Sequence, residues 1–175
     1  MKINANIMLV LSMVLLMTLV TGSTAYDVDS LDIDSIQDNA AVNNIVMADD
    51  EYSCGPAALA TALNRYGLNL TLKDVSCLTD TTPENGTSML SLINASKHFG
   101  FECAGVMIDA SLLKENFIVH MNINGIEHWS VIRNISDGHV FLLDPNEGNV
   151  NFTLEEFAEY YTGSAIMIFK AGNES

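Results

Sequence analysis

The stretch EYSCGPAALATALNRYG, residues 51–67, places a cysteine at the head of the first predicted helix of a domain. Pro56 suits the first helical turn, where its missing N–H does no harm, and Gly67 is a typical helix end. We therefore predict a helix over residues 54–66, with Ser53 as its N-cap. Residues at helical spacing give this helix one apolar face for a core: Leu59, Ala62, Leu63 and Tyr66.

Cys54 stands where a thiol can become a nucleophile. The N-terminus of a helix carries a partial positive charge and free N–H groups, and both stabilise a thiolate. Gly55 would let a substrate backbone approach closely. Because this position stabilises a thiolate, we expect Cys54 to form an ion pair with a histidine. The alternative is that Cys54 is a small buried apolar residue that happens to begin a helix.

The N-terminus has the pattern of a secretory signal peptide. An apolar run over residues 7–20 follows a single lysine and precedes small residues, with a cleavage site predicted after Ala25. Because this run is short for a membrane span, we expect cleavage rather than an uncleaved anchor, and a secreted or cell-surface protein. The expected organisation is a signal peptide, an acidic linker or prosegment, one domain and a short tail, over residues 1–25, 26–47, 48–170 and 171–175.

The chain of 175 residues is strongly acidic, with 22 Asp and Glu against 7 Lys and Arg and a net charge of -15. Removal of the signal peptide would take away only one charge, that of Lys2. Such a surface repels nucleic acid and anionic membranes. We therefore expect no nucleic-acid partner and no membrane contact beyond the signal segment, while the oligomeric state stays open.

Three cysteines in an exported chain suggest one disulfide and one free thiol. Cys54 is the free thiol in this interpretation, which leaves a Cys77–Cys103 pair. The alternative is that Cys77 and Cys103 are ordinary buried thiols.

Six Asn-x-Ser/Thr triplets would accept glycans in an exported protein, although an Asn-rich composition explains some of them. They begin at Asn69, Asn85, Asn94, Asn134, Asn151 and Asn173.

The domain reads as helices followed by strands. A short helix begins at Thr71, with Asp74 at the third position after it, and a third helix covers residues 87–99 until Gly100. The apolar period then changes to two, and Asn-Gly at 124–125 predicts a tight hairpin turn. Strands are predicted over 101–107, 117–123, 126–132, 139–144 and 164–169, and a helix with a capping box over 153–161. This order predicts an α+β fold with an antiparallel sheet.

His128 is the histidine that we expect to pair with Cys54. Its strand precedes the strand that ends in Asp144, and a five-residue loop over 134–138 would place His128 and Asp144 directly opposite each other. A carboxylate at that point would hold the second ring nitrogen and fix the tautomer. A two-residue Asp-Gly turn would instead shift the pairing by three residues, so this register is an assumption. Separately, Asp144 precedes Pro145, and its alternative interpretation is a plain turn residue at the end of a strand.

The other histidines have ordinary structural interpretations. His98 falls in the last turn of a helix, His139 begins a strand beside a turn, and His120 lies in a strand with apolar neighbours. No CxxC, HExxH or glycine-rich phosphate loop occurs, so we expect neither a metal nor another cofactor.

Four stretches, in this order along the chain, resemble the C39 family of cysteine peptidases: YSCGPAALATALNRYG, GTSMLSLINASKHFGFE, FIVHMNINGIEHWSVI and VFLLDPNEG. These peptidases are papain-like domains, best known as the leader-cleaving domain of bacteriocin-exporting ABC transporters. The resemblance runs from about residue 48 to 169 and implies N-terminal helices packed on an antiparallel sheet. It also implies that Cys54 is the nucleophile, His128 the general base and acid, and Asp144 the residue that orients His128.

The chain departs from the family pattern at Ala48. The family usually has a glutamine six residues before the cysteine, and its side chain donates to the oxyanion. Loss of one such donor typically costs about 100- to 1000-fold in turnover. The Cys54 backbone N–H remains as a donor, and the amides of Asn43 and Asn44 are candidate replacements.

The sequence therefore predicts an exported, free-standing C39-type cysteine peptidase that hydrolyses a peptide or amide bond in a peptide or protein substrate. Two alternatives stay open. Ala48 fits a catalytically impaired papain-like binding module, and the same Cys-His-Asp trio occurs in transglutaminase-like acyl transferases.

Overall fold

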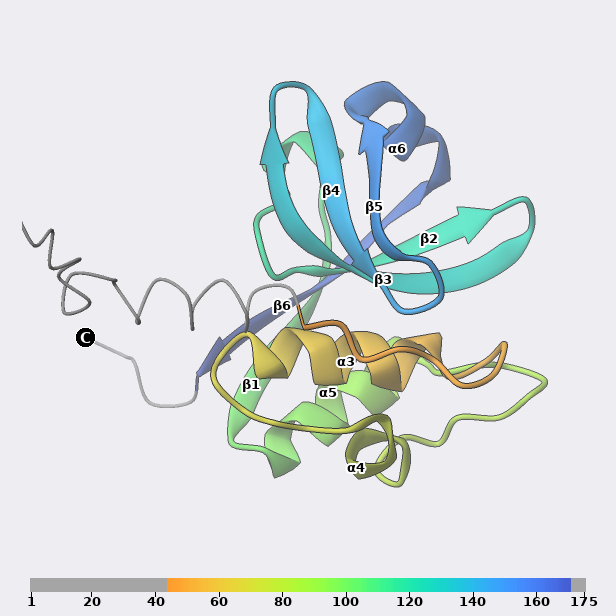
Figure 1. Ribbon diagram of the computed structural model, residues 1–175, viewed down its shortest axis with the longest axis vertical. Coiled ribbons are helices and arrows are strands. Elements are labelled where there is room, and N and C mark those ends of the chain that lie inside the picture. Colours follow the sequence, from red (N-terminus) through yellow and green to blue (C-terminus); the bar gives the residue numbers. More distant parts are fainter. Residues whose placement is uncertain (1–43, 171–175) are drawn as a thin grey trace, which may run out of the picture. The chain divides into compact units, whose positions relative to one another are not determined.

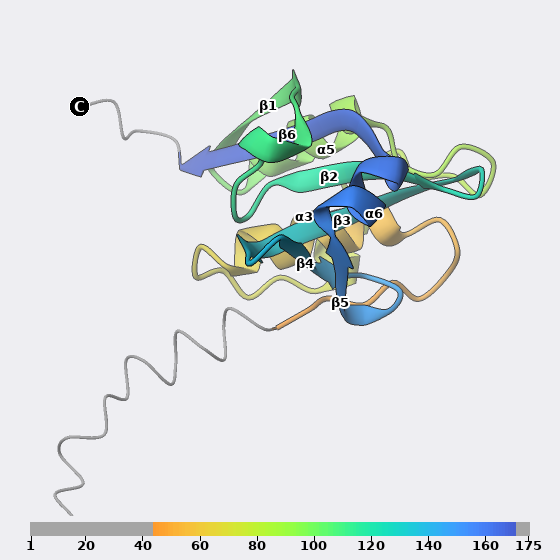
Figure 2. The ribbon, with the colours of Figure 1, turned by 90° about the horizontal axis from the view of Figure 1, so that it is seen from above.

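The computed structural model describes residues 44–170, which form a six-stranded antiparallel sheet and the helices that cover it (Figure 1). The strand order is β1-β6-β2-β3-β4-β5, so the sheet extends from β1 at one edge to β5 at the other (Figure 2). The strands are β1 Phe101–Met107, β2 Ile118–Ile123, β3 Ile126–Ser136, β4 His139–Asp144, β5 Gly148–Thr153 and β6 Tyr161–Lys170. The helices are α3 Cys54–Asn64, α4 Leu72–Ser76, α5 Met89–His98 and α6 Leu154–Tyr160. The predicted α+β class with helices on an antiparallel sheet is confirmed.

The helix α3 begins at the predicted residue and ends two residues before the predicted end. The backbone N–H of Gly67 donates to the carbonyl of Asn64 at 2.9 Å, and the φ of Gly67 is +90°, a conformation that glycine adopts without strain. Tyr66 therefore lies outside the helix, contrary to the prediction. Its hydroxyl donates to the carbonyl of Ile168 at 2.8 Å and ties this turn to β6.

The capping motifs at two later helices are the predicted ones. Thr71 and Asp74 form a reciprocal capping box at α4, and Thr153 and Glu156 form another at α6. The helix α5 begins at Met89, capped by the Ser88 hydroxyl, so it is shorter than predicted at its N-terminal end.

The hairpin between β3 and β4 differs from the predicted five-residue loop. Asp137 and Gly138, with φ of +51° and +75°, form a two-residue turn, and Ser136 pairs with His139. The register then shifts at a bulge between Ile132 and Asn134. The sequence also failed to predict β5, whose residues GNVNFT include only two apolar side chains, Val150 and Phe152, because an edge strand with alternating exposure needs few of them.

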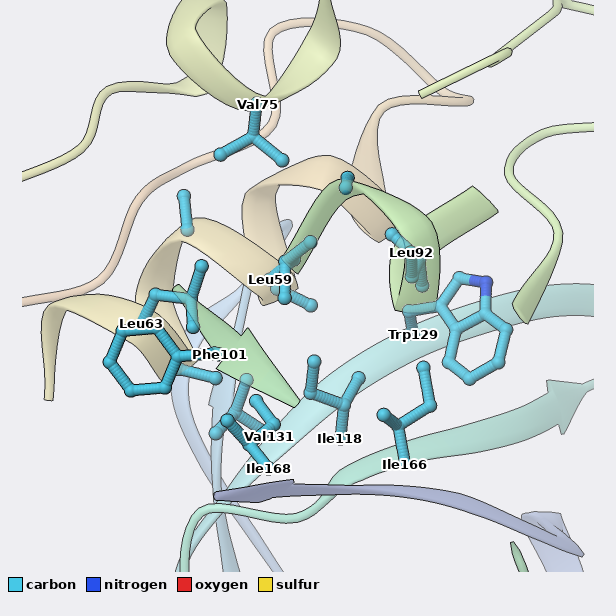
Figure 3. Close-up of a cluster of buried hydrophobic side chains, with 14 of the residues drawn as sticks. Leu59, Leu63, Val75, Leu92, Phe101, Ile118, Trp129, Val131, Ile166 and Ile168 are labelled. Carbon is cyan, nitrogen blue, oxygen red and sulfur yellow. The ribbon is translucent and has the colours of Figure 1, made fainter. Parts of the chain in front are cut away.

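The sheet separates two apolar clusters, because alternate residues of a strand face opposite sides. Val131 and Ile118 face α3 and α5, together with Trp129 and Phe101 (Figure 3). On the other face Ile132 and Val119 pack with Phe157 of α6. The helices α3, α4 and α5 thus lie on one side of the sheet and α6 on the other (Figure 1).

The segment before α3 also contributes to the domain. Ile45 and Val46 pack against the cluster around α3, and the Val46 N–H donates to the Thr61 hydroxyl at 2.9 Å. This segment docks beside the helix and adds no strand to the sheet. The predicted signal peptide and most of the predicted linker lie outside the described residues. Between residues 44 and 170, no helix is long and apolar enough to cross a membrane.

Substitution of a buried leucine in α3 tests the core. Leu59 is 0 % exposed, and we expect Leu59→Ala to lower the free energy of unfolding by about 2–5 kcal/mol through loss of apolar contacts and cavity formation. Leu90 of α5 is 66 % exposed, and Leu90→Ala is the matched control, with a change within about 0.5 kcal/mol. Urea unfolding followed by circular dichroism measures both, and equal effects would contradict this account of the core.

Candidate active site

Cys54 is the first residue of α3, and its side chain is almost fully buried at 6 % exposure. The prediction that the Ser53 side chain caps this helix is wrong. Its hydroxyl instead accepts the backbone N–H groups of Asp49 and Asp50, at 3.3 and 3.4 Å, and makes no cap hydrogen bond. The N-terminus of α3 is thus not covered by its N-cap side chain, and its partial positive charge acts on the thiol and on any anion formed beside it.

Gly55 has a structural role that the sequence did not predict. A Cβ atom at residue 55 would lie 2.7 Å from the Cβ of Thr87, so the close approach that requires glycine is that of the protein's own Thr87. Thr87 is held in turn, because the indole N–H of Trp129 donates to its carbonyl at 3.0 Å. The segment before α5 is thereby packed against the beginning of α3.

His128 and Asp144 form a buried hydrogen-bonded ion pair. The Nε2 atom of His128 lies 2.7 Å from Oδ2 of Asp144, and the two residues are 6 % and 5 % exposed. The sequence had predicted that these two residues lie directly opposite each other, and this prediction is wrong. Val131 pairs with Leu143, a register that places Ser130 opposite Asp144, so His128 is the diagonal neighbour on the same face. Diagonal neighbours in antiparallel strands remain within reach of long side chains.

The turn after β4 holds the Asp144 carboxylate in place. Its Oδ1 atom accepts the backbone N–H groups of Asn146 and Glu147 at 2.9 and 3.1 Å, while Oδ2 faces His128. Burial alone would raise the pKa of Asp144, but the hydrogen bonds from His128 and from the turn lower it below its usual value. The carboxylate is therefore ionised and oriented before any substrate arrives.

His128 lies beside Asp144 and near Cys54, which is one of the groups that raise its pKa. Burial lowers the pKa of His128, but hydrogen bonds to Asp144 and Cys54 and the charges of both outweigh it and raise the pKa to about 9. Because Nε2 faces Asp144, Nδ1 is the nitrogen left for the thiol. The structure thus brings together the three residues that the sequence singled out.

The three residues line two neighbouring cavities. Cys54 lines a cleft of about 480 Å³ that also contains Tyr52, Thr87 and Trp129. His128 and Asp144 line a cavity of about 310 Å³ with apolar walls from Met121, Ile123, Val150 and Phe152. Ile126, which is exposed at the start of β3, borders both.

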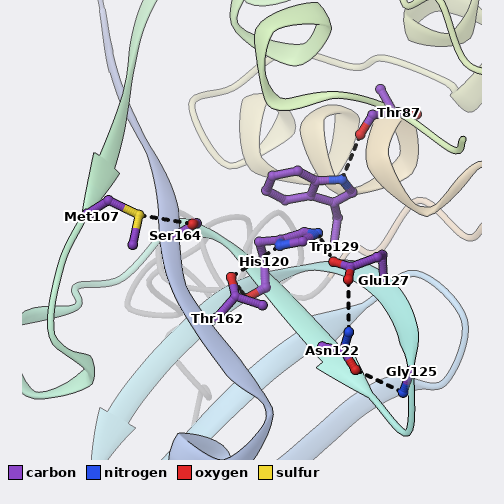
Figure 4. A network of polar contacts seen from close by, with 9 residues as sticks. All are labelled: Thr87, Met107, His120, Asn122, Gly125, Glu127, Trp129, Thr162 and Ser164. Carbon is purple, nitrogen blue, oxygen red and sulfur yellow. Dashed lines mark hydrogen bonds and ion pairs between the residues drawn. The ribbon is translucent and has the colours of Figure 1, made fainter.

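His120 belongs to a polar network that sequence reasoning missed (Figure 4). Its Nε2 atom lies 2.8 Å from a Glu127 carboxylate oxygen, and its Nδ1 lies 3.1 Å from the Thr162 hydroxyl. His120 pairs with Trp129 across the β2–β3 hairpin, and their rings are 4.5 Å apart. The signal available in the sequence was the Asn124-Gly125 turn, which sets this pairing.

The two remaining histidines are placed much as the sequence suggested. His98 is exposed in the last turn of α5, and His139 begins β4 next to the Asp137 turn. Neither lines the cleft that contains Cys54.

Ala48 lies beside the turn that follows Asp144. Its backbone N–H donates to the carbonyl of Pro145 at 2.9 Å, so this position is anchored to the site. The chain upstream runs along α3 away from Cys54, since Val46 already bonds to Thr61, two helical turns further on. Asn44, one of the two candidate replacements for the family's glutamine, precedes Val46 and is exposed, and no contact brings it to Cys54. Asn43 lies outside the described residues.

All three cysteines are free thiols, so the Cys77–Cys103 disulfide considered above is not formed. Cys77 is exposed, and burial raises the pKa of the partly buried Cys103. In the described part of the chain, no group of three or more His, Cys, Asp or Glu side chains is placed to hold a metal ion.

Comparison with known proteins identifies the family of this chain. The sequence model of the peptidase C39 family matches residues 42–173. An uncharacterized protein of Methanothermobacter thermautotrophicus is 36 % identical over 124 residues, which cover 71 % of this chain and 87 % of that protein. The probable functional amyloid protease FapD of Pseudomonas aeruginosa is 29 % identical over 182 residues, covering 94 % of this chain and 80 % of FapD.

A solved structure shows the same fold. A double glycine motif protease from an AMS/PCAT transporter, determined in complex with its leader peptide, matches with a TM-score of 0.66 and 25 % identity. The match covers 73 % of this chain and 91 % of that one. This chain belongs to the peptidase C39 family, whose fold is that of papain-like cysteine peptidases.

Replacement of the carboxylate tests the His128–Asp144 pair. In Asp144→Asn we expect the pKa of His128 to fall from about 9 toward its ordinary value of 6.5, because the neutral amide no longer stabilises the imidazolium. NMR titration of the histidine ring protons measures this pKa. Asp137→Asn, which removes an exposed carboxylate from a turn, should leave the pKa of His128 unchanged.

The same pair predicts how stability depends on pH. A raised histidine pKa adds stability below about pH 6.5 that is lost as pH rises through about 9. The lowered pKa of Asp144 adds stability above about pH 3.8 that is lost on further acidification. The difference in unfolding free energy between the natural protein and Asp144→Asn should therefore be largest from pH 4 to 6.5. A difference that grew toward pH 9 would contradict this assignment.

Proposed function

We propose that this protein is an exported cysteine peptidase that hydrolyses a peptide or amide bond through Cys54, His128 and Asp144. One observation carries the proposal: a buried histidine that is bonded to an oriented carboxylate lies near a thiol at a helix N-terminus. Membership of the C39 family supports peptide-bond hydrolysis as the reaction. Export rests on the predicted signal peptide alone.

The proposed reaction begins with the Cys54 thiolate and the His128 imidazolium. The thiolate attacks the substrate carbonyl carbon, and the electron pair of the carbonyl moves to oxygen. His128 then gives its Nδ1 proton to the leaving amine, and an acyl group remains on Cys54. In the second half, His128 takes a proton from water, which attacks the thioester and restores the thiolate and the imidazolium. Asp144 keeps the ring oriented and stabilises its positive charge throughout.

The oxyanion would be stabilised by the beginning of α3. In this mechanism the Cys54 backbone N–H and the positive end of the helix would stabilise the negative charge that develops on the carbonyl oxygen. With Ala48 the usual glutamine donor is absent, so we expect the natural protein to turn over slowly. This departure is also what favours the second candidate function, a papain-like module that binds peptides without cleaving them.

The substrate is proposed to be a peptide or protein outside the cytoplasm. The structural relative from the AMS/PCAT transporter was solved with a leader peptide, which supports a peptide ligand for this fold. The relative described as a probable functional amyloid protease supports a role on an exported protein substrate. A product in which an amine, rather than water, has been added to the acyl group would instead indicate acyl transfer.

Thiol reactivity tests the proposed nucleophile. At neutral pH we expect iodoacetamide to modify Cys54 at least about tenfold faster than Cys77, because only Cys54 has an imidazolium partner. His128→Ala should remove this advantage. Peptide mapping by mass spectrometry follows both cysteines in one sample, with the exposed Cys77 as the internal control. In a peptide-library digest Cys54→Ala should cleave nothing, and equal labelling of both cysteines would count against the proposal.

Restoring the missing donor tests the role of Ala48. We expect Ala48→Gln to raise turnover of a cleaved library peptide by up to about 100- to 1000-fold, since one oxyanion donor is worth that much. Ala48→Leu adds similar volume without a donor and is the control. Activity that exists only in Ala48→Gln would favour the binding module, whereas turnover by the natural protein would exclude it.

A further inference from the structure

The cleft that contains Cys54 has an unusual charge. Three glutamates line it, Glu51, Glu84 and Glu127, whereas none of the described lysines or arginines does. The cleft qualifies as a substrate site independently of this charge, because the thiol of Cys54 forms part of its wall. The negative charge of the cleft then influences which substrate side chain the cleft binds.

The Glu127 carboxylate already has two partners within the protein. Its carboxylate bonds to His120 Nε2 at 2.8 Å and accepts the Asn122 side-chain amide at 2.8 Å. The Thr162 hydroxyl donates to the backbone carbonyl of His120, so its oxygen accepts from His120 Nδ1. Burial lowers the pKa of His120 below its ordinary value, although the charge of Glu127 opposes this shift. His120 therefore gives Glu127 a hydrogen-bond partner and cancels its charge only when the ring is protonated.

Glu51 and Glu84 remain as uncompensated carboxylates of the cleft. Both side chains are exposed, and neither has an ion-pair partner among the described residues. When His120 is neutral, the Glu127 carboxylate adds a third negative charge to those of Glu51 and Glu84. The cleft is thus negative in either protonation state of His120.

Tyr52 gives a separate indication of this negative field. The charge of Asp50 and a hydrogen bond to it raise the pKa of the Tyr52 phenol, and Asp49 and Glu84 add to the effect. Tyr52 lines the same cleft and is only half-buried, so it also offers an aromatic face to a cation.

We propose that this cleft binds a cationic side chain of the substrate, that of lysine or arginine, on one side of the scissile bond. Glu51 and Glu84 are the specificity-determining residues, and Tyr52 provides an aromatic contact. The proposal rests on the proposed peptidase function for its biological meaning. The cavity beside His128 is lined by several apolar side chains but also by Glu147, so the charge contrast between the two cavities is not part of the proposal.

Charged thiol reagents test the negative potential at Cys54, and this test does not require peptidase activity. The probes are 2-aminoethyl methanethiosulfonate, a cation, and 2-sulfonatoethyl methanethiosulfonate, an anion of similar size. We compare the ratio of their rate constants at Cys54 with the ratio at Cys77 in the same molecule, by mass spectrometry at low salt. The comparison removes the effect of the overall charge of -15, which both thiols experience.

We expect the cation-to-anion ratio at Cys54 to exceed that at Cys77 on the order of tenfold, as two nearby carboxylates at low ionic strength would produce. The double variant Glu51→Gln, Glu84→Gln should reduce the Cys54 ratio to that of Cys77. The matched control, Glu102→Gln, Glu155→Gln, removes two exposed glutamates from β1 and α6 and should leave the ratio unchanged. Equal ratios in the natural protein, or no reaction of Cys54 with either reagent, would overturn the proposal.

A library digest then separates the two proposals. If the natural protein cleaves peptides, cleavage should be enriched next to lysine and arginine, and the Glu51, Glu84 double variant should lose that enrichment. Cleavage without enrichment would overturn the cationic site and leave the peptidase intact. A charge-selective Cys54 in a protein that cleaves nothing would support the cleft and contradict the peptidase.

Discussion

The complete burial of α3 is the constraint on which the rest of the structure depends. Every residue from Cys54 to Asn64 is buried, although the sequence indicated only one apolar face. The sheet covers one side of the helix, α4 and α5 cover others, and Ile45 and Val46 pack beside it. Small residues such as Ala57, Ala58 and Ala60 permit this close approach. A helix enclosed in this way has one possible position, and its first residue is therefore fixed in space.

That fixed position is what the proposed catalytic pair, Cys54 and His128, requires. Cys54 is held by the helix, and His128 is held by a strand in the middle of the sheet, so the two groups meet without long flexible segments. Burying His128 with Asp144 carries a desolvation cost, which the hydrogen bonds from the turn after β4 offset. Such an arrangement is typical of a preorganised site, in which the polar groups are oriented before the ligand binds.

Much of this domain could be predicted from local sequence. The start of α3, the capping boxes at Thr71 and Thr153, and five of the six strands follow from spacing and from residue type alone. The pairing of His128 with Asp144 was predicted through a wrong register. A bulge and a two-residue turn replaced the five-residue loop, and the bond survived because a diagonal neighbour on the same face is still in reach.

Local patterns thus determined most of the helices and strands and the order of Cys54, His128 and Asp144 along the chain. They also carried the resemblance to the C39 family, from which the roles of these three residues were predicted. Only the tertiary structure decided that Gly55 makes room for Thr87, that Ser53 turns away from the helix, and that His120 is tied to Glu127. The physical reason is the range of the interactions. Caps, turns and helical periodicity act between residues a few positions apart, whereas strand register and side-chain packing depend on which distant segments meet.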